Sequence, residues 1–544
     1  MKKRIVTLMV VTTMLPLVLA GCTSKDGAQS AADKSQYVST TPKPSGDINS
    51  VNWGVAGSEP TSLDWIYDWD YGPSNLIEAN LCEGLMRQNP DGSTTPGLAT
   101  KVSSPNDTTY VYTIRDGVTF TDGSPLTADD VAFSLNRNLK ASPPSYWGLW
   151  YQNVASIAAT GRHEVTARLK SPDALFASVM TTPAGYVGEK KYIEQKGSSY
   201  GTAAGGVMCT GPYALESWDK GQSITLKANA HYWDKALEPR AKTFTFSFIP
   251  DPSALNSALL TGEVDGAWSM NVSSLKPLVN AKAGNLYLNK GTEVVGMQFN
   301  DLTTGPLSNP KIREALRALV DYQGITRGLL GGYAAPTKTA APEPTWGYSK
   351  AIWAAGYKAS GGASQDLTKA RQLVKEAGAP TQPIVIAVST DDQSVVSVAT
   401  SIQASAKSVG LDIQVKSFPA SEYTNLFYDP TARAGLNAFM STVTVDTPDP
   451  LEIYYQAIPG SPYNYTGIKN SEWTNYLQEA IASTDDAKRA TATVKAEEVV
   501  DKNVYSISLY SLDARVFLGK RITGVPVSSL SQWYYPWAAT VGAR

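Results

Sequence analysis

Residues 112–131 read YTIRDGVTFTDGSPLTADDV, and this stretch is the most informative one for the fold. The run at 110–114 indicates a strand, and Asp-Gly pairs on either side of residues 118–120 indicate turns around a second short strand. Thr127 precedes Asp130 by three residues, a capping-box spacing that predicts the start of a helix running through Leu135. The stretch therefore predicts a hairpin-like unit followed by a helix.

Helices and strands alternate in the rest of the chain. Residues 366–377 carry an apolar stripe at helical spacing. Residues 384–388 and 411–415 read as strands, and they flank a further helix that ends near Gly410. This strand–helix–strand order predicts an α/β protein rather than an all-β sandwich.

Several motifs resemble those of one protein family. Residues 96–99 (PGLA) and 112–131 resemble the signature of the family 5 extracellular solute-binding proteins, the dipeptide- and oligopeptide-binding components of ABC importers. Other pieces resemble further motifs of this family, in the family's order, and the resemblance covers nearly all of residues 50–544. These pieces are EPTSLD (59–64), TGPY (210–213), TGEVD (261–265), FN (299–300), PL (306–307), KIREAL (311–316) and DTPDP (446–450).

The resemblance implies the architecture of the whole chain. The implied fold is α/β and two-lobed, of the periplasmic-binding-protein type (class II, cluster C), with an extra subdomain in lobe one. Chain crossings between such lobes suit hinge closure over a ligand. The expected parts are a lipoprotein signal peptide (1–21), a flexible tether (22–47), lobe one (48–90, 201–294 and 507–544), its extra subdomain (91–200) and lobe two (295–506).

The N-terminal residues predict export and anchoring. Residues 2–4 (KKR) are positive, and the uncharged run at 5–20 is shorter than the roughly 20 residues that a spanning helix needs, so it reads as a secretory signal peptide. Residues 19–22 (LAGC) resemble a bacterial lipobox, which implies that Cys22 is diacylated; a plain signal peptide is the alternative. Residues 23–47 are rich in small and polar residues and predict a tether. The expected location is the outer face of the cell membrane.

Composition and missing motifs exclude several functional classes. The 544 residues carry a formal net charge of -2, which argues against a dedicated nucleic-acid binder. Two histidines, His163 and His231, cannot make a histidine-rich metal site. No GxSxG, HExxH, P-loop or CxxC motif is present. We therefore expect a binding protein with no cofactor and no metal, and not an enzyme; a secreted hydrolase is the alternative class.

The two cysteines beyond Cys22 predict one disulfide. Proteins outside the cytoplasm meet an oxidising environment. Cys209 stands where the family usually has a glycine, and the resemblance implies that Cys82 and Cys209 both lie in or beside lobe one. A bridge between them would close a loop of about 127 residues. Two buried free thiols are the alternative.

Aromatic residues are the candidates for contact with a ligand. The chain has 13 Trp and 28 Tyr, which combine an apolar face with a polar handle. Groups of them in predicted loops would line a cleft, and core packing is the alternative for each. The candidates are Tyr67, Trp69, Trp147, Trp150 and Trp268, joined by Met270, Asn464 and Tyr465. We expect a short peptide as ligand; an oligosaccharide is the alternative, because aromatic faces also stack on sugar rings.

The resemblance also implies a role for Asp446. Dipeptide- and oligopeptide-binding relatives carry at the matching position an aspartate that pairs with the α-amino group of the ligand. A carboxylate in a water-poor cleft makes a charge-assisted hydrogen bond to an ammonium group. Alternatively, Asp446 only shapes the turn before two prolines. The implied partners are the permease subunits of an ABC transporter, served by a monomeric receptor that binds no nucleic acid.

Overall fold

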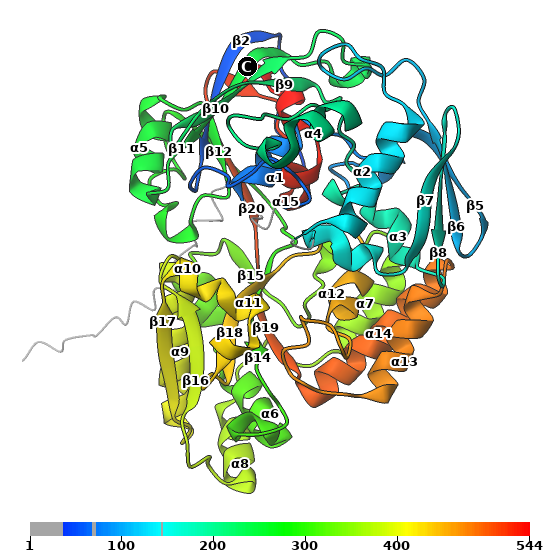
Figure 1. Cartoon of the computed structure of the whole chain (residues 1–544). Coiled ribbons are helices and arrows are strands. Elements are labelled where there is room, and N and C mark those ends of the chain that lie inside the picture. The colour runs from blue at the N-terminus through cyan, green and yellow to red at the C-terminus, as the bar shows by residue number, and fades with distance from the viewer. Residues whose placement is uncertain (1–35, 68–71, 143–144) are drawn as a thin grey trace, which may run out of the picture.

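The protein has two lobes of mixed α/β structure, as Figure 1 shows for the computed structural model, which describes residues 36–67, 72–142 and 145–544. Each lobe is built around its own sheet, and a third, smaller sheet lies at the side of the upper lobe. The two-lobed α/β fold with an extra subdomain is therefore confirmed.

Lobe one contains an eight-stranded sheet. The alternation in β11 shows why these residues form a strand: Phe244, Phe246 and Phe248 fall on one face and are buried there. The sheet order is β1 (Gln36–Tyr37), β13 (Gly284–Asn289), β20 (Ala514–Gly519), β12 (Gly266–Trp268), β2 (Ile48–Val55), β11 (Ala241–Phe248), β10 (Ser223–Ala228) and β9 (Tyr213–Asp219). The helices of this lobe are α1 (Pro73–Glu78), α5 (Pro252–Thr261) and α15 (Ser529–Tyr534), and its two small sheets pair β3 (Met86–Gln88) with β4 (Thr94–Pro96) and β21 (Ile522–Thr523) with β22 (Gly542–Ala543).

The extra subdomain holds an antiparallel sheet with helices beside it. Its strands, in sheet order, are β5 (Ala99–Asn106), β6 (Thr109–Ile114), β8 (Glu164–Leu169) and β7 (Val154–Gly161), and its helices are α2 (Ala128–Lys140), α3 (Ala174–Val179) and α4 (Lys190–Lys196). The expected hairpin of 110–114 with 118–120 is wrong. Because β6 pairs with β5 on one side and β8 on the other, no edge is left for residues 118–120, where Thr119 bridges Pro125 instead.

Lobe two contains a six-stranded sheet and most of the longer helices. The sheet order is β15 (Ala334–Pro336), β19 (Ser506–Leu512), β14 (Val294–Phe299), β18 (Ala438–Val443), β16 (Ile384–Ser389) and β17 (Ile413–Phe418). The helices are α6 (Pro310–Leu319), α7 (Lys350–Ala359), α8 (Leu367–Ala377), α9 (Gln393–Ser408), α10 (Ala420–Tyr423), α11 (Asn425–Tyr428), α12 (Leu451–Gln456), α13 (Ser471–Ile481) and α14 (Asp486–Asn503). The predicted strands at 384–388 and 411–415 correspond to β16 and β17, which pair in parallel across α9.

Two crossings join the sheets of the lobes. The chain passes from β13 in lobe one to β14 in lobe two through residues 290–293, and it returns from β19 to β20 at Asp513. The first crossing ends at Glu293, because Val294 already belongs to β14 of lobe two, and the second lies later than residue 507. Residues 507–512 belong to lobe two because β19 pairs with β14 and β15 there.

The expected flexible tether ends earlier than residue 47. β1 pairs with β13, and Thr41 Oγ1 accepts hydrogen bonds from the backbone N–H groups of Gly524 and Val525. Tyr37 donates to the carboxylate of Asp513 at 2.7 Å. Backbone pairing needs no large apolar side chains, so the polar composition of residues 36–47 did not reveal that this segment is held against lobe one.

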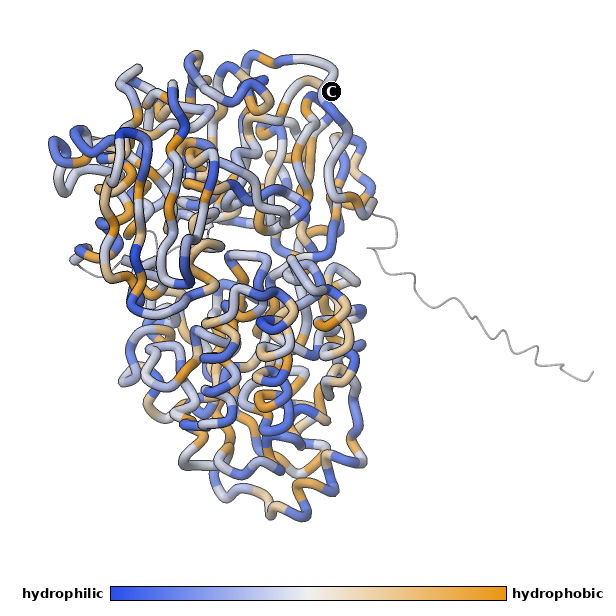
Figure 2. Tube along the Cα trace, turned by 90° about the vertical axis from the view of Figure 1, so that its right-hand side faces the viewer, coloured by the Kyte–Doolittle hydropathy of each residue, from blue (hydrophilic) through white to orange (hydrophobic). Residues whose placement is uncertain are grey.

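The hydrophobic core follows the strands of both lobes, and the turns at the periphery are hydrophilic (Figure 2). One buried cluster continues from the extra subdomain, with Tyr112 and Trp147, to Trp473 and Leu477 of lobe two and to Tyr534 of α15. The lobes therefore lie in contact. Within the described residues, no helix is both long and apolar enough to cross a membrane.

The predicted disulfide is present. Cys82 and Cys209 are bonded, with their Cα atoms 5.0 Å apart, and both are buried in the core of lobe one. The bridge joins positions separated by 127 residues, which links the segment after α1 to the segment before β9.

Candidate functional site

A cavity of about 500 Å³ lies where the two lobes meet. Lobe two supplies most of its wall, from β14, β18, the segment around residue 464 and the helices α11 to α14. Tyr146 of the extra subdomain and Trp533 of α15 close it from lobe one. Glu293, in the first crossing between the lobes, also lines it. The site thus combines groups from both lobes and from a linker, the arrangement that makes a cavity sensitive to lobe closure.

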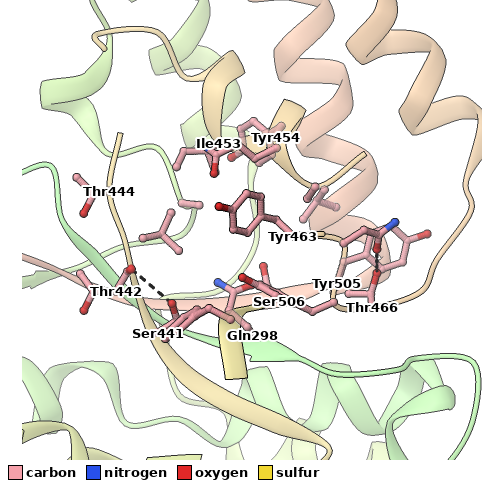
Figure 3. Close-up of a pocket in the computed structure, with 18 of the residues that line it drawn as sticks. Gln298, Ser441, Thr442, Thr444, Ile453, Tyr454, Tyr463, Thr466, Tyr505 and Ser506 are labelled. Atoms are coloured by element: carbon pink, nitrogen blue, oxygen red, sulfur yellow. Dashed lines mark hydrogen bonds between the residues drawn. The ribbon is translucent and has the colours of Figure 1, made fainter. Parts of the chain in front are cut away.

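The lining is aromatic and polar but nearly uncharged. Figure 3 shows hydroxyl and amide side chains from several segments around the space, with the ring of Tyr463 among them. The aromatic members are Tyr146, Phe427, Tyr428, Tyr454, Tyr463, Tyr465, Trp473, Tyr505 and Trp533. The neutral polar members include Gln298, Ser441, Thr442, Thr444, Gln456, Asn464, Thr466 and Ser506. None of the described lining residues is Lys, Arg or His, and Glu293 is their single carboxylate.

Two predicted residues, Asn464 and Tyr465, line this cavity. Their turn is held locally, because Thr466 donates to Asn464 Oδ1 at 2.9 Å and Asn464 Nδ2 donates to the carbonyl of Ile468 at 3.1 Å. The Tyr465 ring packs edge-on against Phe439, with the centroids 5.0 Å apart. A turn fixed in this way presents its side chains to the cavity with little loss of entropy on binding.

Most of the other aromatic candidates are core residues and do not line the cavity. Trp268 packs against both Trp53 and Trp537, with ring centroids 6.4 and 6.0 Å away. Met270 lies in a separate core cluster, and Trp147 and Trp150 are buried in the core of the subdomain. Tyr67 is half-buried, with its hydroxyl 3.5 Å from the carbonyl of Ser142. Trp69 lies outside the described residues. Large aromatic side chains bury the most apolar surface, so they are favoured in the core over a position at the cavity.

Asp446 lies deep in the contact between the lobes. It is 1% exposed, and its Oδ1 accepts a hydrogen bond of 2.6 Å from the hydroxyl of Tyr534 in lobe one. The backbone N–H groups of Asp446 and Thr447 donate to the carboxylate of Glu452. Burial raises the pKa of Glu452, and the neighbouring charge of Asp446 raises it further.

Asp446 stands behind the wall of the cavity rather than in its lining. Tyr463, which does line the cavity, is close enough to Asp446 for the charge of Asp446 to affect its pKa. Burial raises the pKa of Tyr463 to about 12, and Tyr428 and Asp446 add to this effect. The structure therefore brings Asp446 near the cavity but engages one of its oxygens with a side chain of the opposite lobe.

Sequence reasoning missed several lining residues. Tyr463 sits in the same segment as Asn464 and Tyr465, so proximity in sequence could have found it. Glu293 and Gln298 lie next to and within β14 and carry no motif. Nothing in the local sequence shows that a strand end will face a cavity between lobes.

Comparison with known proteins identifies the family. The model of the bacterial extracellular solute-binding proteins, family 5, matches residues 93–465. The oligopeptide-binding protein OppA of Bacillus subtilis is 27% identical over 574 aligned positions, which cover 98% of this chain and 99% of that relative. The glutathione-binding protein GsiB of Salmonella typhi is 29% identical over 330 positions, or 60% of this chain and 61% of the relative.

Solved structures show the same fold. The substrate-binding protein CtaP of Listeria monocytogenes superposes with a TM-score of 0.79 at 22% identity, covering 91% of this chain and 99% of that one. The periplasmic binding protein DppA of Helicobacter pylori, in complex with the peptide STSA, has a TM-score of 0.77 at 20% identity and covers 92% and 98% of the two chains. With the family model matching well over half of its length, this chain belongs to the bacterial extracellular solute-binding proteins of family 5.

Proposed function

We propose that this protein is an extracytoplasmic, lipid-anchored receptor that captures a short peptide between its lobes and delivers it to the permease subunits of an ABC transporter. The observation that carries the proposal is the cavity of about 500 Å³ at the meeting of the lobes. Its volume lies within the range of about 300–1,000 Å³ typical of small-molecule sites. The crossings at 290–293 and Asp513 allow the lobes to open and close around it.

Neutral donors and acceptors in the lining favour a peptide. The hydroxyl and amide groups along β18 and residues 463–466 suit the amide groups of a peptide backbone. Trp473 lines the cavity and is 4% exposed, so its ring contributes mainly apolar surface to the wall. The relatives named for oligopeptides and glutathione support the same class of ligand.

An oligosaccharide is the second candidate, favoured by the aromatic rings in the lining. Mass spectrometry of ligand co-purified from the native host, followed by titration against peptide and oligosaccharide panels, separates the two. A saccharide in the co-purified fraction, with no peptide binding in titration, would replace the peptide proposal. Turnover of the bound compound would instead indicate a hydrolase.

Asp446 stays a prediction as the anchor of a ligand amino terminus. In this role, the ammonium group of the ligand would either displace the hydroxyl of Tyr534 from the Asp446 carboxylate or donate to the carboxylate alongside it. One peptide, free and N-acetylated, titrated against the wild type and Asp446→Asn tests it. If acetylation and the substitution each change affinity by less than about threefold, under 1 kcal/mol, Asp446 is not the anchor.

Anchoring at Cys22 is a proposal from the sequence, since residues 1–35 lie outside the described range. A diacyl anchor holds a protein on a membrane, whereas a single acyl chain binds only marginally. Wild-type protein should partition into the detergent phase, and Cys22→Ala should leave it unprocessed or shed. Mature wild-type protein in the aqueous phase would refute the anchor.

A further inference from the structure

We propose that Glu293 selects the charge of the ligand: the cavity takes a ligand that brings an ammonium or guanidinium group to the Glu293 carboxylate and places no carboxylate of its own inside. This rests on the proposed function in using the same cavity, and it names the chemical class of the ligand. It differs from the expected role of Asp446, because it assigns the charged contact to a residue of the linker between the lobes.

The position of Glu293 is fixed by its backbone. It is the last residue of the crossing at 290–293, directly before β14, and its carbonyl accepts a hydrogen bond of 2.9 Å from the N–H of Leu512 at the end of β19. Both connections between the sheets therefore meet at this residue. Glu293 is one of the residues that line the cavity, and it is half-buried.

The carboxylate of Glu293 has no hydrogen bond and no ion pair to any described residue. Burial raises its pKa, and the positive charge of Arg515 opposes the rise. Arg515 does not complete the pair, since its Nε donates to the carbonyl of Met270 and its Nη1 donates to the carbonyl of Asp513. A carboxylate that is half-buried and has no donor in the protein is unfavourable, and a ligand cation would satisfy it.

The rest of the lining excludes a second, negative charge. No described lining residue is cationic, so a ligand carboxylate would enter without a partner and close to Glu293. Arg433 lies behind the ring of Tyr465, 4.9 Å from its centroid. It is already committed to Asn300 Oδ1 and to the carbonyl of Leu426. The cavity thus offers a charged partner to cations alone.

Asp446 does not offer an equivalent second acceptor. Its Oδ1 is occupied by Tyr534, and Glu452 stands beside it and accepts from its backbone N–H. Neither Asp446 nor Glu452 lines the cavity. A cation that enters therefore finds no carboxylate other than Glu293 among the described lining residues.

The experiment measures how ligand charge and Glu293 depend on each other. A tripeptide that binds the wild type is prepared as the amide with a free amino group, as the N-acetylated amide and as the N-acetylated acid, which are positive, neutral and negative. An N-acetylated lysyl peptide amide shows whether the cation comes from the amino terminus or from a side chain. Each is titrated against the wild type, Glu293→Gln and Asp513→Asn. Asp513 is the matched control, because it lies at the other crossing beside Arg515 but does not line the cavity.

In the wild type, the cationic forms should bind at least about tenfold tighter than the neutral form, and the acid more weakly still. Glu293→Gln should reduce the preference for the cation to within about threefold and leave the neutral form unchanged. Asp513→Asn should keep the preference. The proposal is overturned if the wild type binds the cationic and neutral forms alike, or if the acid binds as well as the cation. It is also overturned if Glu293→Gln weakens binding of the cationic amide and the N-acetylated amide equally, because that result would indicate an effect on the linker alone.

A failure of the peptide proposal gives a different result. In that case no peptide of any charge binds, and the same comparison is made with an amino-sugar disaccharide and its N-acetylated form. A preference for the free amine that depends on Glu293 would keep the charge proposal while the peptide is abandoned. Equal binding of the two saccharides, or of neither, would overturn the charge proposal as well.

Discussion

Glu497 shows at the scale of one residue how burial changes a carboxyl group. It lies in α14, is 6% exposed, and accepts hydrogen bonds from the hydroxyls of Tyr454 and Ser360. Burial raises its pKa to about 7, although both hydrogen bonds favour the charged form. Desolvation therefore outweighs the two hydroxyl donors, and the folded protein keeps this proton at pH values where the unfolded chain has lost it.

This difference predicts a pH dependence of stability. Between the unfolded pKa near 4.5 and the folded value of about 7, the folded state binds more protons, so the free energy of unfolding falls as pH rises. Glu497→Gln keeps an acceptor for Tyr454 and removes the titration, so it should flatten this fall by up to about 3 kcal/mol. Urea unfolding from pH 5 to 8 measures it. The control is Glu479→Gln, an exposed position on α13, and an equal flattening in both variants would contradict the assignment.

At the scale of an element, α2 begins where the sequence predicts. Thr127 Oγ1 accepts from the N–H of Asp130 at 3.2 Å, and Asp130 Oδ2 accepts from the N–H of Thr127 at 3.0 Å. The other oxygen of Asp130 accepts from the N–H of Lys190 and so ties the start of α2 to the start of α4. The cap thus serves the subdomain as well as the helix.

Thr127→Ala should reduce the free energy of unfolding by about 1 kcal/mol, because it removes the acceptor for an N–H at the helix start. Ser528→Ala is a suitable control, since Ser528 precedes α15 in the same way but its side chain makes no capping hydrogen bond. Thermal or urea unfolding of the two variants compares them. A loss in Ser528→Ala as large as that in Thr127→Ala would show that the cap is not the cause.

At the scale of the whole molecule, covalent and non-covalent links hold distant parts of lobe one together. The Cys82–Cys209 bond joins two of its three sequence parts, and β1 brings the N-terminal segment against β13. Tyr37 reaches Asp513 at the second crossing. The start of the described chain is therefore attached to one of the two connections between the lobes.

Removal of the disulfide should destabilise the protein by about 2–4 kcal/mol, because the unfolded chain regains the freedom of a long loop. The double variant Cys82→Ala/Cys209→Ala, compared with the wild type by urea unfolding, measures this. Reductant supplies the control: it should lower the unfolding midpoint of the wild type and leave that of the variant unchanged. Equal midpoints for the wild type and the variant in the absence of reductant would rule out a stabilising bridge.

The sequence alone was sufficient for the features that local chemistry controls. The cap at Thr127, the strands around α9 and the family motifs all depend on residues that are close in the chain. The cysteine pair followed from the compartment and from the implied placement of two segments. These predictions hold because short-range spacing determines helix starts and strand faces wherever tertiary contacts agree with them.

Only the tertiary structure decided which side chains meet at the cavity. Trp268 and Trp147 read as ligand contacts in the sequence, yet both pack in the core, because a large ring gains more from burial wherever neighbouring elements can cover it. Glu293 carries no local signal, and it lines the cavity because the two crossings between the lobes converge at its position. A site assembled from both lobes and a linker depends on contacts between residues far apart in the chain, and no local pattern records those contacts.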